Sequence, residues 1–390
     1  MEIFVCSPVR TAVGAFCGSL SSIQAHMLGS ALISHIIQTQ ALDPLEISEV
    51  IMGQVLVGGM GQNPARQSAI KAGLDKATPA WMVSQVCGSG MRAIALAAST
   101  IKSGDANMII AGGQENMSLA QHSIHMRKPI KMGHGALQDM MITDGLWDAF
   151  NDYHMGNTAE NLAKLYSINR DEADLFAYTS QMRASKAQQS GKFTQEIVPI
   201  KILVGKDEVL FRDDEYIRHD SSIEGLAKLK PAFDKSGIVT AGNASGINDG
   251  GAAMIIANAT YVQKCNLQPI ARIVSTSHCG VEPSIMGIGP ASATKIALSK
   301  AGWKIEDLDL VESNEAFAVQ AIAVQKELGL DPNIVNVNGG SIAIGHPIGA
   351  SGARIITTLL HEMKRRNSKK GLATMCVGGG MGVATCFELC

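Results

Sequence analysis

Length, composition and charge narrow the possible functions of this chain. It has 390 residues, with 33 Lys and Arg against 35 Asp and Glu, and a formal net charge of −2. This balance gives no electrostatic footprint for nucleic acid or a membrane surface, and no apolar run reaches the roughly 18 residues of a membrane helix. We therefore expect two or three domains and a small-molecule partner.

The cysteines and glycines indicate the compartment and the fold class. Eight cysteines are scattered without CxxC pairs, which predicts neither a zinc cluster nor a disulfide framework and fits a reduced cytoplasm. MEIFVCSPVRTAVG at the start has no basic leader, and FELC at the end is no peroxisomal signal, so we expect a cytoplasmic protein. Forty glycines with 4% aromatic residues are typical of buried strands that end in tight turns, which favours layered α/β.

The first distinctive segment in chain order is SQVCGSG (84–90), which precedes the helix-favouring stretch MRAIALAA (91–98). A thiol at a helix start lies beside free backbone N–H groups and the positive end of the helix dipole, and both favour a thiolate. Cys87 is therefore a candidate nucleophile. The alternative is a small buried hydrophobe in a glycine-rich turn.

The sequence around this helix recurs in the second half of the chain. Three pairs of segments match in order: PLEISEVIMG (44–53) with IEDLDLVESN (305–314), SGMRAI (89–94) with SGARII (351–356), and MIIAGG (108–113) with ATMCVGGG (373–380). Self-similarity of this kind predicts two copies of one α/β unit.

A polar segment over about 120–248 separates the two copies. Its methionines do not follow helical spacing. They could fill a core, or they could form an adaptable surface for a ligand or a second subunit. These residues are Met126, Met132, Met140, Met141 and Met155. Residues 158–190 have amphipathic periodicity that is broken at SINRDE, which predicts a helix end followed by an Asn-capped helix start. The segment therefore forms an insertion with its own helices.

The second copy supplies further reactive residues. NEAFA (314–318) follows a predicted strand, GHPIGASGARI (345–355) places His346 before the second helix, and CVGGGMG (376–382) places Cys376 beside glycines whose N–H groups can face a ligand. If the two units pack about a pseudo-twofold axis, the Cys87 and His346 turns face each other.

Metal and dinucleotide sites are not expected. His122 and His125 have no acidic or cysteine partner at ligand spacing. CVGGGMG is superficially similar to a dinucleotide-binding loop, but only eight residues follow Gly382, which is too few for a βαβ unit.

Together, the motifs resemble the thiolase family over the whole chain, and within it the short-chain acetyl-CoA acetyltransferases. The resemblance is carried by SQVCGSGMRA, IVTAGNASGINDGGAAM, GHPIGASGARI and CVGGGMG, while YHMGNTAENLA (153–163) is similar to the biosynthetic branch. Ser84, Ile238 and Cys17 depart from the family pattern, which has asparagine, threonine and glycine there. We expect these three departures to affect the fine tuning of the activity and not the type of reaction.

The resemblance implies the thiolase fold, an α/β fold of two duplicated βαβαβαββ units in a five-layer αβαβα arrangement with an inserted loop domain. The implied N-terminal thiolase domain is 1–119 plus 249–269. The loop domain, 120–248, would bind CoA and make oligomer contacts, and 270–390 would form the C-terminal thiolase domain. The implied assembly is a homotetramer.

The resemblance also implies roles for individual residues. Cys87 matches the acyl-accepting nucleophile, His346 its base, and Cys376 the acid/base that handles the α-proton of the second substrate. Asn314, through a water, and His346 would form a first oxyanion hole, and the N–H groups of Cys87 and Gly378 a second. The implied CoA-binding residues are His154, Met155, Arg218 and Ser245.

The implied activity is the reversible Claisen condensation of two acetyl-CoA to acetoacetyl-CoA and CoA by ping-pong acyl-cysteine chemistry. CoA thioesters would be the substrates, and no separate cofactor is expected. A broader 3-ketoacyl-CoA thiolase of fatty-acid β-oxidation is the alternative. Condensing enzymes of the ketosynthase or hydroxymethylglutaryl-CoA synthase type lack the second cysteine, and a non-catalytic scaffold would be expected to have lost Cys87 or His346.

Overall fold

A computed structural model describes residues 1–128 and 130–390. Ten of its strands form one mixed sheet: β1 (Ile3–Arg10), β2 (Gly14–Ala15), β3 (Glu49–Gly53), β4 (Ala80–Val83), β5 (Met108–Asn116), β12 (Asn248–Asn258), β13 (Pro269–Gly280), β14 (Leu310–Ser313), β15 (Lys370–Val377) and β16 (Met381–Leu389). Their order is β14-β15-β16-β13-β1-β12-β5-β3-β4, with β2 paired to β12.

The strand order repeats on either side of the β1–β13 pair, which joins two halves of the sheet. In the first half β3 runs parallel to β4 and β5, and β12 runs antiparallel to β5. In the second half β14 runs parallel to β15 and bridges in parallel to Val335, and β16 runs antiparallel to β15. The duplication predicted from the sequence is therefore confirmed.

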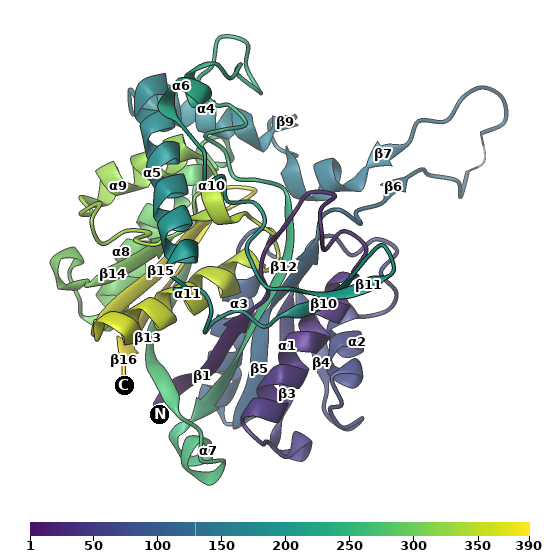
Figure 1. Cartoon of the computed structure of the whole chain (residues 1–390), viewed down its shortest axis with the longest axis vertical. Coiled ribbons are helices and arrows are strands. Elements are labelled where there is room, and N and C mark those ends of the chain that lie inside the picture. Colours follow the sequence, from purple (N-terminus) through teal and green to yellow (C-terminus); the bar gives the residue numbers. More distant parts are fainter. Residues whose placement is uncertain (129) are drawn as a thin grey trace.

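Helices between these strands complete two βαβαβαββ units. They are α1 (Ala25–Thr39), α2 (Pro64–Lys71) and α3 (Ser89–Ser103) in the first unit, and α8 (Gly289–Ala301), α9 (Ala318–Leu328) and α11 (Ser351–Arg366) in the second. α3 and α11 contact each other and both halves of the sheet, whereas α1 and α2 cover the first half and α8 and α9 the second (Figure 1). These contacts give the expected five layers.

The two central helices start very close to each other because both begin with Ser-Gly. A Cβ atom on Gly352 would lie 2.4 Å from the backbone nitrogen of Met91, and one on Gly90 would lie 2.9 Å from that of Ala353. No larger residue fits at this crossing without displacing backbone. Apolar side chains such as Ile94 of α3 and Ile355 of α11 then fill the layer between the sheet halves. The close crossing brings the loops that precede both helices to one place.

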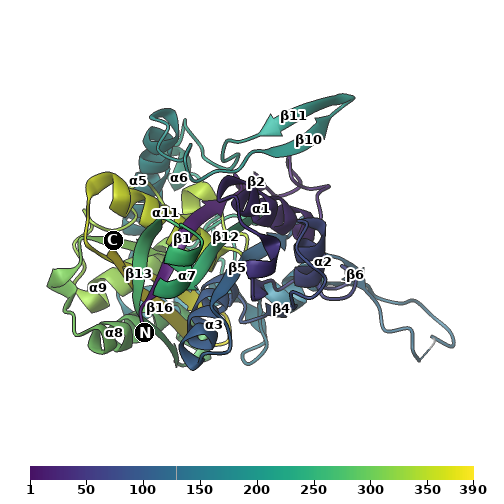
Figure 2. The same cartoon turned by 90° about the horizontal axis from the view of Figure 1, so that it is seen from below.

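The segment between β5 and β12 carries its own elements. Its helices and strands are β6 (His122–Ser123), β7 (Gln138–Asp139), β8 (Trp147–Asp148), β9 (Tyr153–His154), α4 (Met155–Leu165), α5 (Arg170–Gln189), β10 (Ile200–Val204), β11 (Asp207–Phe211) and α6 (Ile223–Ala227). Asn169 caps α5 in a capping box with Glu172, which confirms the helix boundary predicted at SINRDE. The paired β6 and β7 form an arm that extends from the body (Figures 1 and 2).

Shorter elements complete the chain: a π-helical turn (Met141–Leu146), α7 (Ala259–Lys264), α10 (Ser341–Ile344), and 3-10 turns at Pro44–Glu46, Pro283–Ile288 and Ile305–Asp307. None of the helices in the described parts of the chain combines the length and the apolar character needed to cross a membrane. The domain limits implied by the sequence remain a prediction.

Candidate active site

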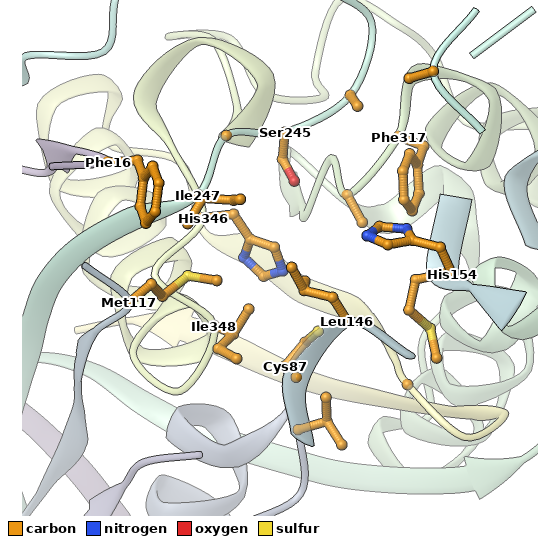
Figure 3. A pocket seen from close by; sticks show the side chains of 18 of the residues that line it. Phe16, Cys87, Met117, Leu146, His154, Ser245, Ile247, Phe317, His346 and Ile348 are labelled. Atoms are coloured by element: carbon orange, nitrogen blue, oxygen red, sulfur yellow. The ribbon is translucent and has the colours of Figure 1, made fainter. Parts of the chain in front are cut away.

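A cavity of about 390 Å³ lies where the loops before α3 and α11 meet the insertion. Cys87, His346 and Gly378 border it from the two α/β units, and side chains of the insertion border it opposite them (Figure 3). The rest of the lining is largely apolar and includes Phe16, Val86, Met117, Leu146, Ile247, Phe317 and Ile348. Such a lining suits a ligand with one reactive polar group on an apolar body.

Cys87 stands in a strained turn two residues before α3. Val86 has a φ of 44°, in the left-handed region that β-branched residues avoid. The Ser89 hydroxyl holds this turn because it accepts a hydrogen bond from the Gln85 N–H at 2.8 Å and donates one to the Val86 carbonyl at 2.6 Å. The half-buried Cys87 thiol thereby borders the cavity.

The resting protonation state of Cys87 follows from two opposing effects. Burial raises the pKa of its thiol to about 11, although the N–H groups of Gly378 and of Cys87 itself face the sulfur and lower the pKa. The N–H groups expected from the sequence are therefore present, but desolvation outweighs them and the thiol is protonated at rest. Cys87 needs a base to become a nucleophile.

His346 has the unprotonated nitrogen that a base requires, and its tautomer follows from its partners. Its Nδ1 lies 2.6 Å from the Ser351 hydroxyl oxygen, which also lies 2.8 Å from the Pro347 carbonyl oxygen. Because that carbonyl can only accept, the hydroxyl donates to Pro347 and accepts from Nδ1–H, which leaves Nε2 unprotonated. Nε2 is buried and has no partner among the described residues. Burial and the charge of Arg354 lower the pKa of His346 to about 3, so the ring is neutral at pH 7.

Two buried residues of the first unit anchor the loop that carries His346. Asn248 Oδ1 accepts the His346 backbone N–H at 2.9 Å. Glu115 Oε2 accepts the N–H of Gly349 at 2.9 Å and that of Val55 at 3.0 Å. Burial raises the pKa of Glu115 to about 7. Neither anchor is marked by a motif in the sequence, and the Ser351 contact is signalled there only by the match of Ser351 with Ser89.

Cys376 and Asn314 lie behind the cavity wall and do not line the cavity. Cys376, near the end of β15, is fully buried, and burial and then the nearby Cys87 raise the pKa of its thiol. Asn314 directly follows β14 and is 1% exposed. Its Oδ1 accepts a hydrogen bond from the Ser341 hydroxyl at 2.6 Å, and its Nδ2 has no partner among the described residues. Both strand ends therefore bring polar groups to the same edge as Cys87.

The four expected CoA-binding residues do not all meet at the cavity. His154, Met155 and Ser245 line it, and the His154 ring stacks on Phe233 with 4.6 Å between centroids. Arg218 is exposed and instead lines a smaller neighbouring cavity. Tyr216 borders both cavities, and the Arg218 guanidinium carbon lies 5.7 Å from the centre of its ring. Arg218 thus contacts the wall of the larger cavity at Tyr216 and does not line that cavity.

Metal-ligating side chains do not cluster in the described residues. Within them, no group of three or more His, Cys, Asp or Glu side chains is arranged to hold an ion. His122 Nε2 lies 3.7 Å from Asp139 Oδ2 on the arm, as an isolated pair.

Comparisons with known proteins agree over the whole chain. Residues 3–260 match the family model "Thiolase, N-terminal domain" and residues 267–389 match "Thiolase, C-terminal domain". An acetyl-CoA acetyltransferase of Chromobacterium violaceum is 56% identical over 390 residues, 100% of both chains. The crystal structure of Bacillus anthracis acetyl-CoA acetyltransferase has a TM-score of 0.97 at 42% identity, covering 100% of this chain and 99% of that one. Human mitochondrial 3-ketoacyl-CoA thiolase has the same TM-score and coverage at 40% identity. The chain therefore belongs to the thiolase family.

Proposed function

We propose that this chain is an acetyl-CoA C-acetyltransferase that interconverts two acetyl-CoA with acetoacetyl-CoA and CoA. The observation that carries the proposal is one cavity bordered by a thiol and by an imidazole with a free, unprotonated nitrogen, with a second thiol behind its wall. The names of the bacterial relatives support the same reaction. CoA, acetyl-CoA and acetoacetyl-CoA are the proposed partners, and CoA thioesters act as substrates without a separate cofactor.

In the first half-reaction of cleavage, Cys87 attacks the 3-keto carbon of acetoacetyl-CoA while His346 Nε2 takes the thiol proton. Proton transfer accompanies bond formation, because a pKa of about 11 keeps the Cys87 thiol protonated until the attack. The oxygen that becomes negative accepts hydrogen bonds from the N–H groups of Cys87 and Gly378. These two groups already face the Cys87 sulfur.

The carbon–carbon bond then breaks, and the departing acetyl-CoA carbanion takes the proton of Cys376. A pKa held above the ordinary value keeps Cys376 protonated at rest, which suits this donation. The enolate oxygen of the departing group is stabilised by the imidazolium Nε2–H of His346 and by a water held on Asn314. Cys376 next takes the proton of CoA, whose sulfur attacks acetyl-Cys87, and His346 returns its proton to Cys87. Condensation is the reverse sequence.

A broader 3-ketoacyl-CoA thiolase is the second candidate, favoured by the equal TM-score of the human mitochondrial 3-ketoacyl-CoA thiolase. The two candidates differ in the length of acyl chain that the apolar cavity admits.

The experiment follows the magnesium-complexed enolate of acetoacetyl-CoA, whose absorbance falls when CoA is added to a thiolase. We expect rapid loss with the C4 substrate and a steep decline along a C4 to C16 series of 3-ketoacyl-CoA. Equal rates along the series would favour the broader enzyme, and no CoA-dependent loss with any substrate would exclude both.

We further propose a cytoplasmic homotetramer in which the arm joins pairs of dimers. Exposed apolar side chains on the arm support this assembly, since a lone chain would leave them in water: Met126, Met132 and Leu137.

A further inference from the structure

A chain of three buried side chains runs behind the cavity and ends on Asn314. Arg354 Nη2 donates to the Ser341 hydroxyl oxygen at 2.5 Å, and this hydroxyl donates to Asn314 Oδ1 at 2.6 Å. The exposed fractions of Arg354, Ser341 and Asn314 are 1%, 0% and 1%. The sequence motifs predict no role for Arg354 or Ser341.

The direction of these hydrogen bonds is fixed by chemistry. A guanidinium can only donate, so the Ser341 oxygen is its acceptor. Among the described residues, the hydroxyl proton of Ser341 has one acceptor, Asn314 Oδ1. An amide oxygen accepts and an amide nitrogen does not, so Oδ1 must face Ser341. The Asn314 Nδ2 donor is thereby turned away from Ser341, and it has no partner among the described residues.

Arg354 lies between two elements. It belongs to α11, and its Nη1 lies 3.9 Å from Oε2 of Glu312, a buried residue of β14. Ser351, which fixes the His346 tautomer, is the first residue of the same helix. One rigid helix therefore orients both groups of the first oxyanion hole, His346 through Ser351 and Asn314 through Arg354 and Ser341.

We propose that Ser341 and Arg354 are positioning residues that keep the Asn314 amide with its N–H donors available to the reaction. This inference rests on the proposed function, in which Asn314 serves the enolate through a water. Without the Ser341 proton, the amide can turn over and present its oxygen, an acceptor that repels a developing negative charge. Loss of one oxyanion-hole donor costs about 100- to 1,000-fold. A misoriented donor that is still present should cost less, on the order of 10- to 100-fold.

The test compares two rates in Ser341→Ala: acetylation of Cys87 by acetyl-CoA, measured by quenched mass spectrometry, and steady-state cleavage of acetoacetyl-CoA. We expect cleavage to fall on the order of 10- to 100-fold, with acetylation reduced clearly less and KM for acetoacetyl-CoA little changed. Ser341→Thr, which keeps the hydroxyl, should recover most of the loss. Ser277→Ala is the matched control, because Ser277 is a buried serine whose hydroxyl caps the Ala293 carbonyl at 2.6 Å.

A double-mutant cycle of Ser341→Ala and Asn314→Ala tests whether Ser341 acts through Asn314. If Ser341 acts through Asn314, adding Ser341→Ala to Asn314→Ala lowers the cleavage rate no further. Multiplicative losses, or an equal fall of acetylation and cleavage in Ser341→Ala, would overturn the inference. If Ser341→Ala does not fold, the same two rates are compared in Ser341→Cys, whose side chain has a similar volume and is a weaker hydrogen-bond donor. A wild-type chain without cleavage activity would overturn the proposed function itself, whereas these variants test the inference alone.

Discussion

The Cys87 thiol borders the cavity and has a raised pKa. The rate at which it is alkylated should depend on both properties. Because burial raises that pKa to about 11, the thiolate fraction increases about tenfold with each pH unit up to that value. We therefore expect the rate of Cys87 alkylation by iodoacetamide to rise about tenfold per unit from pH 7 to pH 9 without a plateau. Peptide mass spectrometry gives the rates residue by residue.

Protection provides the control for this labelling. Acetyl-CoA should protect Cys87, because acylation consumes the thiol, and should leave the exposed Cys390 reactive. A plateau of the Cys87 rate below pH 8 would mean a thiolate at rest and would contradict the dominance of desolvation.

The two active-site cysteines are predicted to separate by half-reaction. Cys376→Ala keeps Cys87, its turn and His346, so acetylation by acetyl-CoA should survive. Turnover of acetoacetyl-CoA should fall on the order of 100- to 10,000-fold, because the group that moves the α-proton is lost. Labelled acetyl-enzyme and steady-state turnover are measured on the same preparation.

Cys87→Ala is the companion variant and should abolish both reactions. Near-wild-type turnover of Cys376→Ala would make the second cysteine structural, and would remove the main distinction from a one-cysteine condensing enzyme.

At this scale the sequence indicates reactive residues but not the residues that orient them. Cys87, His346 and Cys376 stand in glycine-rich motifs next to predicted helix and strand ends, which is a local signal. Glu115 reaches Gly349 across 234 positions and Asn248 reaches His346 across 98. No periodicity or spacing encodes contacts of that range, so only the folded chain reveals them.

Among the elements, those with a repeated pattern could be predicted and the irregular ones could not. The helices that begin at Ser89 and Ser351 follow from the matched segments, and the α5 start follows from the Asn169 cap. The strands β6 and β8 have two residues each. A strand of two residues contains no repeat of the two-residue alternation, so pairing alone defines it.

Strand β1 ends in a buried ion cluster that ties it to the insertion. Arg10, which is fully buried, contacts Asp214 at 2.7 Å and Glu196 at 2.6 Å. Arg10→Met would leave both buried carboxylates without their counter-ion, so we expect the free energy of unfolding to fall by about 3–5 kcal/mol. Urea denaturation followed by circular dichroism measures this change.

An exposed pair is the control for the Arg10 cluster. Lys201→Met removes a pair with Glu208 at 2.7 Å in which both side chains are largely exposed, so the urea midpoint should hardly move. A comparably small shift for Arg10→Met would mean that the cluster contributes no more than a surface pair.

Over the whole molecule, the two copies of the α/β unit place residues with different tasks at equivalent positions. Ser89 and Ser351 begin the two central helices, yet Ser89 holds the Cys87 turn and Ser351 sets the tautomer of His346. Neither unit contains both side chains of the proposed thiol–imidazole pair, because Cys87 comes from one and His346 from the other. The insertion adds the remaining wall with His154, Met155 and Ser245, so the site exists only in the assembled chain.

The exposed apolar side chains of the arm lead to a prediction about the number of subunits. Met132 is 95% exposed and Leu137 is 64% exposed, which is unfavourable for an isolated chain in water. Light scattering should therefore give a mass near four times 41.1 kDa, and Met132→Glu with Leu137→Glu should give dimers, since buried like charges would oppose the contact. Leu45→Glu, at an exposed leucine far from the arm in sequence, should leave the tetramer intact. A wild-type mass near twice 41.1 kDa would refute the tetramer, and the arm would then make no contact between dimers.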